Sequence, residues 1–212
     1  KVEEQPPLPI ENNVLKTFSI ENEPVVELVN NREREYIFAD LPDIGYSTDI
    51  DTVMASSYQV KKQLQQIVKI EQPITNTLLY KRILRIWNLT RVTTRLQVFI
   101  DNLLEDAYKD PLSGDTIIYW EDEEKAKDCD FYRINSKRDI LDIPILEVMS
   151  AARYAIEQQI SMPTEDLKRL TSQLLGFSRK RNNLDMITEQ AIQLLIDKEI
   201  FSHANGMVSM NN

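Results

Sequence analysis

The sequence predicts a mainly α-helical protein with short β-hairpins, an α+β fold arranged as two tandem winged-helix units, each with a helix-turn-helix. Segments of the chain 88 residues apart share a pattern of apolar residues, which indicates an internal repeat. Each copy is expected to contain three helices followed by a pair of strands, which is the order typical of a winged helix. The expected units are residues 58–143 and 144–212, after an acidic, proline-containing linker or docking segment at residues 1–57.

The repeat is weak but ordered, because one constant offset aligns apolar positions along both copies without a gap. Few aligned residues are identical, so chance similarity between two helical segments is the alternative interpretation. The aligned pairs include Val60 with Val148, Leu64 with Ala152, Ile67 with Ala155, Leu79 with Leu167, Leu96 with Leu184, Phe99 with Ile187 and Leu104 with Ile192.

Apolar spacing defines three helices in the first copy. The first helix is expected to end near Gln72-Pro73, because proline disfavours helix in the residue before it. Thr75 or Asn76 can cap the second helix, and the third begins near Val92. The buried positions are Val60, Leu64, Ile67 and Val68 in the first helix, Leu79, Ile83, Ile86 and Trp87 in the second, and Leu96, Phe99, Ile100, Leu103 and Ala107 in the third.

A short turn separates the second and third helices of each copy, at residues 88–90 and 176–178, and the third helix of the second copy is expected to begin near Arg181. A strand pair should follow each third helix. In the first copy it is residues 116–120 and 131–134, with an acidic loop between them as the wing. In the second it is residues 199–203 and 207–210, joined by Asn205-Gly206, which is the strongest short-range signal for a hairpin. Residues 25–29 and 36–38 look like short strands or docking segments.

The charge is unevenly distributed along the chain, although the formal net charge is −9. Residues 60–100 contain eight basic residues and one acidic residue, Glu71, whereas residues 1–59 contain four basic and 12 acidic residues. The acidic loop carries Glu121, Asp122, Glu123, Glu124, Asp128 and Asp130. The basic segment therefore favours contact with a polyanion, while the acidic loop is repelled by phosphate.

Most catalytic chemistry is excluded by composition. Four glycines in the chain leave no phosphate-binding loop. Cys129 and His203 are the single cysteine and histidine, so neither a zinc site nor a Cys-His pair can be assembled. We expect a solvated thiol at Cys129 and a strand surface residue at His203. The cluster Glu123-Glu124-Lys125 is expected to lie in a solvated loop. The chain is therefore expected not to be an enzyme and to contain no catalytic residue, metal or cofactor.

The chain also lacks a long apolar run and the basic-then-apolar order of a signal peptide. A cytoplasmic protein without membrane contact is therefore expected. The chain begins at Lys1 within a proline-rich stretch, which is how a fragment cut from a larger protein looks.

The first residues of each third helix are the candidate nucleic-acid contacts, because this part of a helix-turn-helix enters the major groove. An alternative for Arg91 and Arg179 is that both are buried and close the turn. Trp87 and Trp120 are expected in the core rather than as stacking platforms for bases. The candidate contacts are Arg91, Thr93, Thr94, Arg95, Gln97, Arg179, Lys180, Arg181, Asn182 and Asn183.

Several spaced motifs resemble a domain of unknown function at the C-terminus of large bacterial superfamily-one DNA helicase-like proteins. They are residues 67–74 (IVKIEQPI), 79–83 (LYKRI), 89–91 (LTR), 130–133 (DFYR), 137–138 (KR), 143–144 (IP) with Glu147, and 174–179 (LLGFSR). Gln72 and Asn88 stand where that family usually has glycine. The resemblance implies a helicase core and a restriction-endonuclease-like domain earlier in the parent polypeptide.

Two functions follow as hypotheses. The first is a non-catalytic accessory module that binds DNA and contacts other domains of a helicase- or nuclease-like parent. The alternative is a winged-helix module for protein–protein or intramolecular contacts that does not touch nucleic acid. Fold alone does not decide between them.

Overall fold

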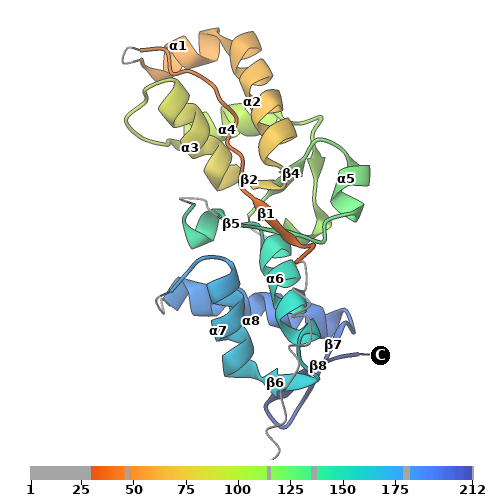
Figure 1. Cartoon of the computed structure of the whole chain (residues 1–212). Helices are drawn as coiled ribbons and strands as arrows, with labels where there is room; N and C mark the ends of the chain where they lie inside the picture. The colour runs from red at the N-terminus through yellow and green to blue at the C-terminus, as the bar shows by residue number, and fades with distance from the viewer. Residues whose placement is uncertain (1–29, 46–47, 114–115, 135–137, 179–181, 212) are drawn as a thin grey trace, which may run out of the picture. The chain divides into compact units, whose positions relative to one another are not determined.

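The helices repeat at the spacing that the sequence predicts. The computed structural model describes residues 30–45, 48–113, 116–134, 138–178 and 182–211 (Figure 1). The first repeat contains α2 (Ser57–Glu71), α3 (Asn76–Ile86) and α4 (Thr94–Leu103), and the second contains α6 (Ile145–Glu157), α7 (Thr164–Leu174) and α8 (Asn182–Asp197). Each helix of the second repeat begins 88 positions after its counterpart, which confirms the offset. The third helices begin within two residues of the expected positions.

Each repeat also has its own three-stranded sheet, and the strand order is the same in both. In the first, β2 (Ile74–Thr75), β3 (Tyr108–Lys109) and β4 (Ile118–Trp120) form an antiparallel sheet in the order β2-β4-β3. In the second, β6 (Ser161–Pro163), β7 (Phe201–Ala204) and β8 (Met207–Met210) have the order β6-β8-β7. The last strand is therefore central in both, and the protein is a mainly helical α+β structure.

The expected hairpin of the second repeat is confirmed. Strands β7 and β8 pair in antiparallel fashion, with Ala204 opposite Met207. Asn205 and Gly206 both have positive φ angles, 53° and 75°. A two-residue turn requires this conformation because it matches the right-handed twist of the strands.

The expected hairpin of the first repeat is wrong. Residues 118–120 do form a strand, but its partners are β2 and the two-residue strand β3. The other expected strand, β5 (Tyr132–Ile134), pairs in parallel with β1 (Glu33–Glu35) near the N-terminus. Aromatic and β-branched residues predicted both strands, but they could not identify partners that are very short or entirely charged.

The acidic stretch after β4 is consequently not a wing. It forms a short helix, α5 (Glu123–Lys127), which begins where the Asp122 side chain accepts a hydrogen bond from the Lys125 amide at 2.9 Å. Lys125 pairs with Glu121, and Lys127 pairs with Glu123 at 2.9 Å. Strands β3 and β4 are connected by residues 110–117, of which residues 114–115 lie outside the described residues.

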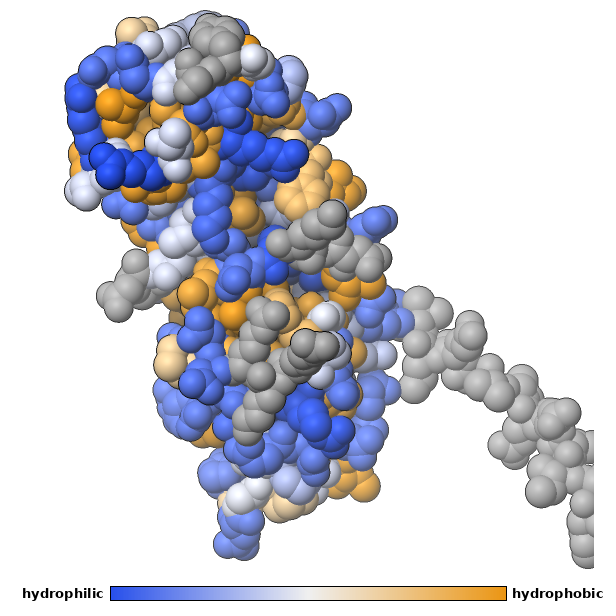
Figure 2. All heavy atoms as spheres, turned by 90° about the vertical axis from the view of Figure 1, so that its left-hand side faces the viewer, coloured by the Kyte–Doolittle hydropathy of each residue, from blue (hydrophilic) through white to orange (hydrophobic). Residues whose placement is uncertain are grey.

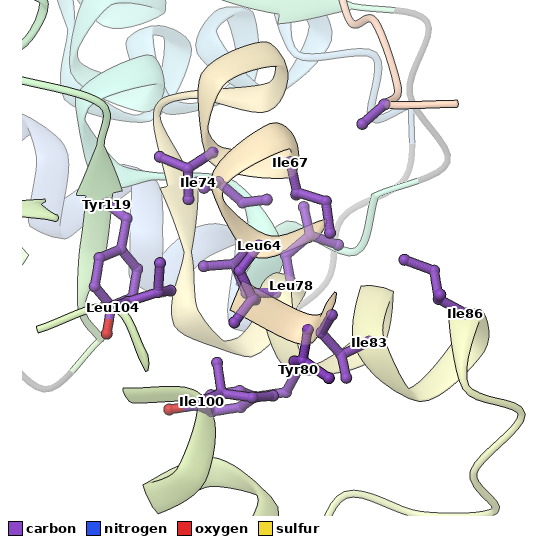
Figure 3. Close-up of a cluster of buried hydrophobic side chains, with 14 of the residues drawn as sticks. Leu64, Ile67, Ile74, Leu78, Tyr80, Ile83, Ile86, Ile100, Leu104 and Tyr119 are labelled. Atoms are coloured by element: carbon purple, nitrogen blue, oxygen red, sulfur yellow. The ribbon is translucent and has the colours of Figure 1, made fainter. Parts of the chain in front are cut away.

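Two hydrophobic cores lie in the chain from Asn31 to Asn212, one in each repeat. Figure 3 shows Leu64, Leu78 and Ile83 close together between α2 and α3 in the first core. Burying one such side chain contributes roughly 1.5–3 kcal/mol. Trp87 and Trp120 are 3% and 1% exposed, which confirms that both are core residues.

The segment before α2 adds to the first core. Val53 of α1 (Ile50–Ala55) is fully buried, and Tyr36 and Ala39 are buried with it. No strand forms at residues 36–38, because the pairing with β5 ends at the hydrogen bond from the Tyr36 amide to the Ile134 carbonyl. The strand expected at residues 25–29 lies outside the described residues.

Candidate nucleic-acid interface

Two local features position the start of α4, namely its N-cap residue and the turn that precedes it. The Thr93 hydroxyl accepts a hydrogen bond from the Leu96 amide at 3.2 Å, so Thr93 is the N-cap. Asn88, which follows the C-cap residue of α3, has a φ of 53°, and its counterpart Gly176 has a φ of 87°. Asparagine tolerates this left-handed conformation better than most residues. The departure from glycine at position 88 therefore leaves the turn between α3 and α4 similar to its counterpart.

The candidate residues of the first repeat lie together along the chain at the surface. Arg91, Thr94 and Arg95 are exposed, and Thr93 and Gln97 are half-buried. The expectation that Arg91 is buried to close the turn is therefore wrong. The free amide groups of a helix N-terminus carry partial positive charge, so this region favours an anion. Arg85, in the last turn of α3, is a further exposed cation in this part of the chain and was not among the predicted contacts.

Folding places a carboxylate next to half of the cations in the basic segment. Four of its eight cations have a carboxylate partner within 3.2 Å: Lys61 with Asp106, Lys81 with Asp142, Arg82 with Glu71, and Arg95 with Asp51. Three of those carboxylates come from outside residues 60–100. Among the described residues, Lys62, Lys69, Arg85 and Arg91 make no ion pair. The charge count along the sequence therefore overstates the positive charge available to a ligand.

Only two of the candidate residues of the second repeat lie among the described residues. Arg179, Lys180 and Arg181 lie outside the described residues, whereas Asn182 and Asn183 are exposed at the start of α8. Helix α8 contains Asp185, Glu189 and Asp197 but no lysine or arginine. The described part of this helix therefore offers amide groups but no cation to a phosphate.

Residues from the motifs that carry the family resemblance meet in the interior instead. The buried carboxylate of Glu147 accepts hydrogen bonds from the Arg133 amide at 3.0 Å and from Arg138 at 2.7 and 3.0 Å, and it pairs with the Arg133 guanidinium. Burial alone would raise the pKa of Glu147, but the two arginines outweigh burial and lower the pKa to about 2. This cluster is ionised at neutral pH and is part of the structure rather than an exposed site.

A second buried carboxylate, Glu71, connects the N-terminal segment to the first repeat. It accepts hydrogen bonds from the Tyr36 hydroxyl at 2.6 Å and the Ala39 amide at 3.0 Å, and it pairs with Arg82 at 2.9 Å. Arg133 donates to the Glu71 and Pro73 carbonyl oxygens at 2.7 and 2.6 Å, so the two carboxylate clusters adjoin. Sequence reasoning missed both clusters, although the quoted motifs contain Glu71, Arg133, Arg138 and Glu147.

The single cysteine and the single histidine of the chain both lie among the described residues. Cys129 is half-buried rather than solvated, and burial together with the nearby Glu147 carboxylate raises the pKa of its thiol to about 12. A thiol with this pKa is protonated at neutral pH and is a poor nucleophile. His203 is exposed on β7, as expected.

Within the described parts of the chain, no group of three or more His, Cys, Asp or Glu side chains is placed to hold a metal ion. None of the helices in these described parts has the length and apolar character needed to span a bilayer.

A family model described as "Protein of unknown function (DUF3320)" matches residues 55–98. This stretch extends from the end of α1 through α2 and α3 into α4, and the description states no activity or ligand. Comparisons with curated proteins and with solved structures give no match.

Proposed function

We propose that this chain is a non-catalytic accessory module made of two winged-helix units, and that the first unit binds nucleic acid, with DNA as the expected ligand. The winged-helix assignment is supported by the element order, which is helix, strand, helix, helix, strand, strand in both repeats. The shared strand order, with the last strand in the centre, supports it further.

The observation that carries the proposed binding site is a set of three exposed arginines between the end of α3 and the first turn of α4. Arg85 and Arg91 are exposed and form no ion pair among the described residues. Arg95 is 58% exposed and pairs with Asp51, which is itself 72% exposed. Such an exposed pair contributes only about 0–1 kcal/mol, so a phosphate group can displace Asp51 from Arg95.

The position of the acidic stretch removes one objection to this proposal. An acidic wing between two strands would lie beside the third helix and would repel a phosphate backbone. In the structure, these acidic residues belong to α5 and its flanks, after the last strand of the sheet. The strongest concentration of negative charge is therefore not in the connection that serves as a wing.

The parent protein is part of the proposal. The resemblance to domains of helicase-like proteins supports a helicase- or nuclease-like parent in the bacterial cytoplasm, and the family match over residues 55–98 is compatible with it. Other domains of that parent are then the expected protein partners, and the chemistry is theirs.

Reversing the charge of Arg85 and Arg91 together tests the binding site. The Arg85→Glu, Arg91→Glu variant is expected to bind a labelled DNA duplex roughly tenfold or more weakly at about 50 mM salt, because two phosphate contacts are lost. The slope of log affinity against log salt should fall by about 2. Fluorescence anisotropy over a salt series measures both quantities.

The matched control is the Arg169→Glu, Lys198→Glu variant, which makes the same change in net charge at exposed positions of the second repeat. Both variants should unfold at the temperature of the wild type, since surface changes cost within about 0.5 kcal/mol each. Equal loss of binding in the two variants would indicate a nonspecific charge effect and contradict the proposed site.

The second candidate function is protein–protein contact without nucleic acid. It is favoured by Val98, which is 54% exposed on α4, because helix faces that read base edges present hydrogen-bonding side chains. Undetectable binding of the wild-type chain to any DNA or RNA at about 50 mM salt would support this candidate.

A further inference from the structure

The third helix of each repeat has a shallow pocket at the same place. On α4 the pocket measures about 300 Å³, and on α8 it measures about 260 Å³. Val98, Phe99 and Asn102 line the first, and residues 88 positions later, Met186, Ile187 and Gln190, line the second. We call these the α4 pocket and the α8 pocket. The other residues of the α4 pocket are Met54, Thr94 and Arg95.

The α8 pocket is completed by the sheet of the first repeat. Thr75 of β2 and Ile118 of β4, which are paired in the sheet, form part of its wall. Both are almost fully buried, at 1% and 2% exposed. The adjoining segment is fixed by Asp142, which pairs with Lys81 at 2.7 Å and accepts a hydrogen bond from Thr77 at 3.2 Å. The sheet of the first repeat therefore lines the same pocket as the third helix of the second repeat.

At the equivalent positions, the sheet of the second repeat and the third helix of the first repeat have exposed apolar residues. In the second repeat, the strand register puts Pro163 and Met207 in the positions of Thr75 and Ile118. Pro163 is exposed and Met207 is 37% exposed. In the first repeat, the described residues that line the α4 pocket include none from a sheet, and Val98 is 54% exposed. Figure 2 shows hydrophobic residues in patches bordered by hydrophilic ones on one face of the molecule.

We propose that copies of this chain associate head to tail, with the end of the second sheet at Pro163 and Met207 in one copy packed against the α4 pocket of the next. The contact continues the interface that already joins the two repeats, since it brings together the same structural positions. Two different surfaces meet in such a heterologous contact, so it builds a ring or an open chain of copies. Burial of Val98 and Met207 is the apolar contribution to the contact.

The test uses the full chain without nucleic acid and measures molar mass by sedimentation and light scattering as concentration rises. The wild type is expected to exceed the mass of a monomer. Val98→Glu and Met207→Glu should each remain monomeric, because each variant has lost one of the two surfaces. An equimolar mixture of the two should form a dimer, because each variant supplies the surface that the other lacks.

Met186→Glu is the matched control, since Met186 is 63% exposed at the α8 pocket but belongs to neither of the two surfaces that are proposed to meet. It should associate like the wild type. If either glutamate variant loses its helical circular dichroism, Val98→Lys or Met207→Lys replaces it. A wild type that stays monomeric, a single variant that still associates, or a mixture without dimers would each overturn the proposal.

Discussion

Glu147→Ala is expected to lower the free energy of unfolding by about 3–5 kcal/mol, because it leaves two buried guanidinium groups without their carboxylate. Glu147 is fully buried, and Arg133 and Arg138 are 5% and 6% exposed. Chemical denaturation monitored by circular dichroism measures the change. Glu189→Ala is the control, because Glu189 is 71% exposed and lies 3.7 Å from Lys168. Equal effects of the two substitutions would show that the buried cluster contributes no more to stability than an exposed carboxylate does.

Stability is also expected to depend on pH through Glu147. Its pKa is about 2 in the folded protein, against an ordinary value of 4.5. A carboxyl group with a lowered pKa stabilises the fold fully above its unfolded pKa, and this stabilisation is lost as the pH falls from 4.5 towards 2. The loss corresponds to about 3 kcal/mol. Denaturation curves between these pH values measure it, and Glu147→Gln should show a smaller pH dependence. An unchanged dependence in that variant would exclude Glu147 as the cause.

Glu71→Ala is expected to destabilise the protein by a similar amount, about 3–5 kcal/mol, and to release the N-terminal segment first. The substitution removes the acceptor of the Tyr36 hydroxyl, the Ala39 amide and Arg82, all of which are largely buried. The segment beyond keeps the hydrogen bond from the Ile44 amide to the Ile86 carbonyl at 3.0 Å. Loss of protection should therefore be greatest around Ala39.

Hydrogen exchange by mass spectrometry or NMR resolves this local opening from global unfolding. In the Glu71→Ala variant, the Ala39 amide should exchange faster than amides in the centre of α6, which belong to the second core. Glu71→Gln is the conservative variant, and it should have an intermediate effect because its side-chain oxygen still accepts one hydrogen bond. An Ala39 amide that exchanges as slowly as in the wild type would contradict the role assigned to Glu71.

The contrast between the two third helices bears on how the chain is used. Helix α4 contains the exposed Arg95, whereas α8 contains acidic residues and no cation, and Arg179, Lys180 and Arg181 before α8 lie outside the described residues. Residue 173, the counterpart of Arg85, is glutamine. The proposed nucleic-acid site lies in the first repeat, and the proposed association between copies uses a surface from each repeat.

The sequence by itself determined the repeat, the helices and the second hairpin. Apolar residues at helical spacing, such as Val60, Leu64 and Ile67, are neighbours on one face whatever the rest of the chain does. Gln72 before Pro73 ended α2, and Asn205-Gly206 formed the turn between β7 and β8, because each acts on its own backbone. Such local signals can be read without knowing the fold.

Only the tertiary structure decided which strands pair and which charges remain available. The pairing of β5 with β1 joins residues 99 positions apart, and the ion pair between Lys81 and Asp142 joins residues 61 positions apart. Neither partner has a local signal, because Glu33–Glu35 is a charged tripeptide and Asp142 is one of many acidic residues. Burial of Glu71 and Glu147 likewise depends on arginines brought close by folding, and an isolated carboxylate would be too costly to bury. Long-range contacts therefore determined how much positive charge remains exposed at the start of α4.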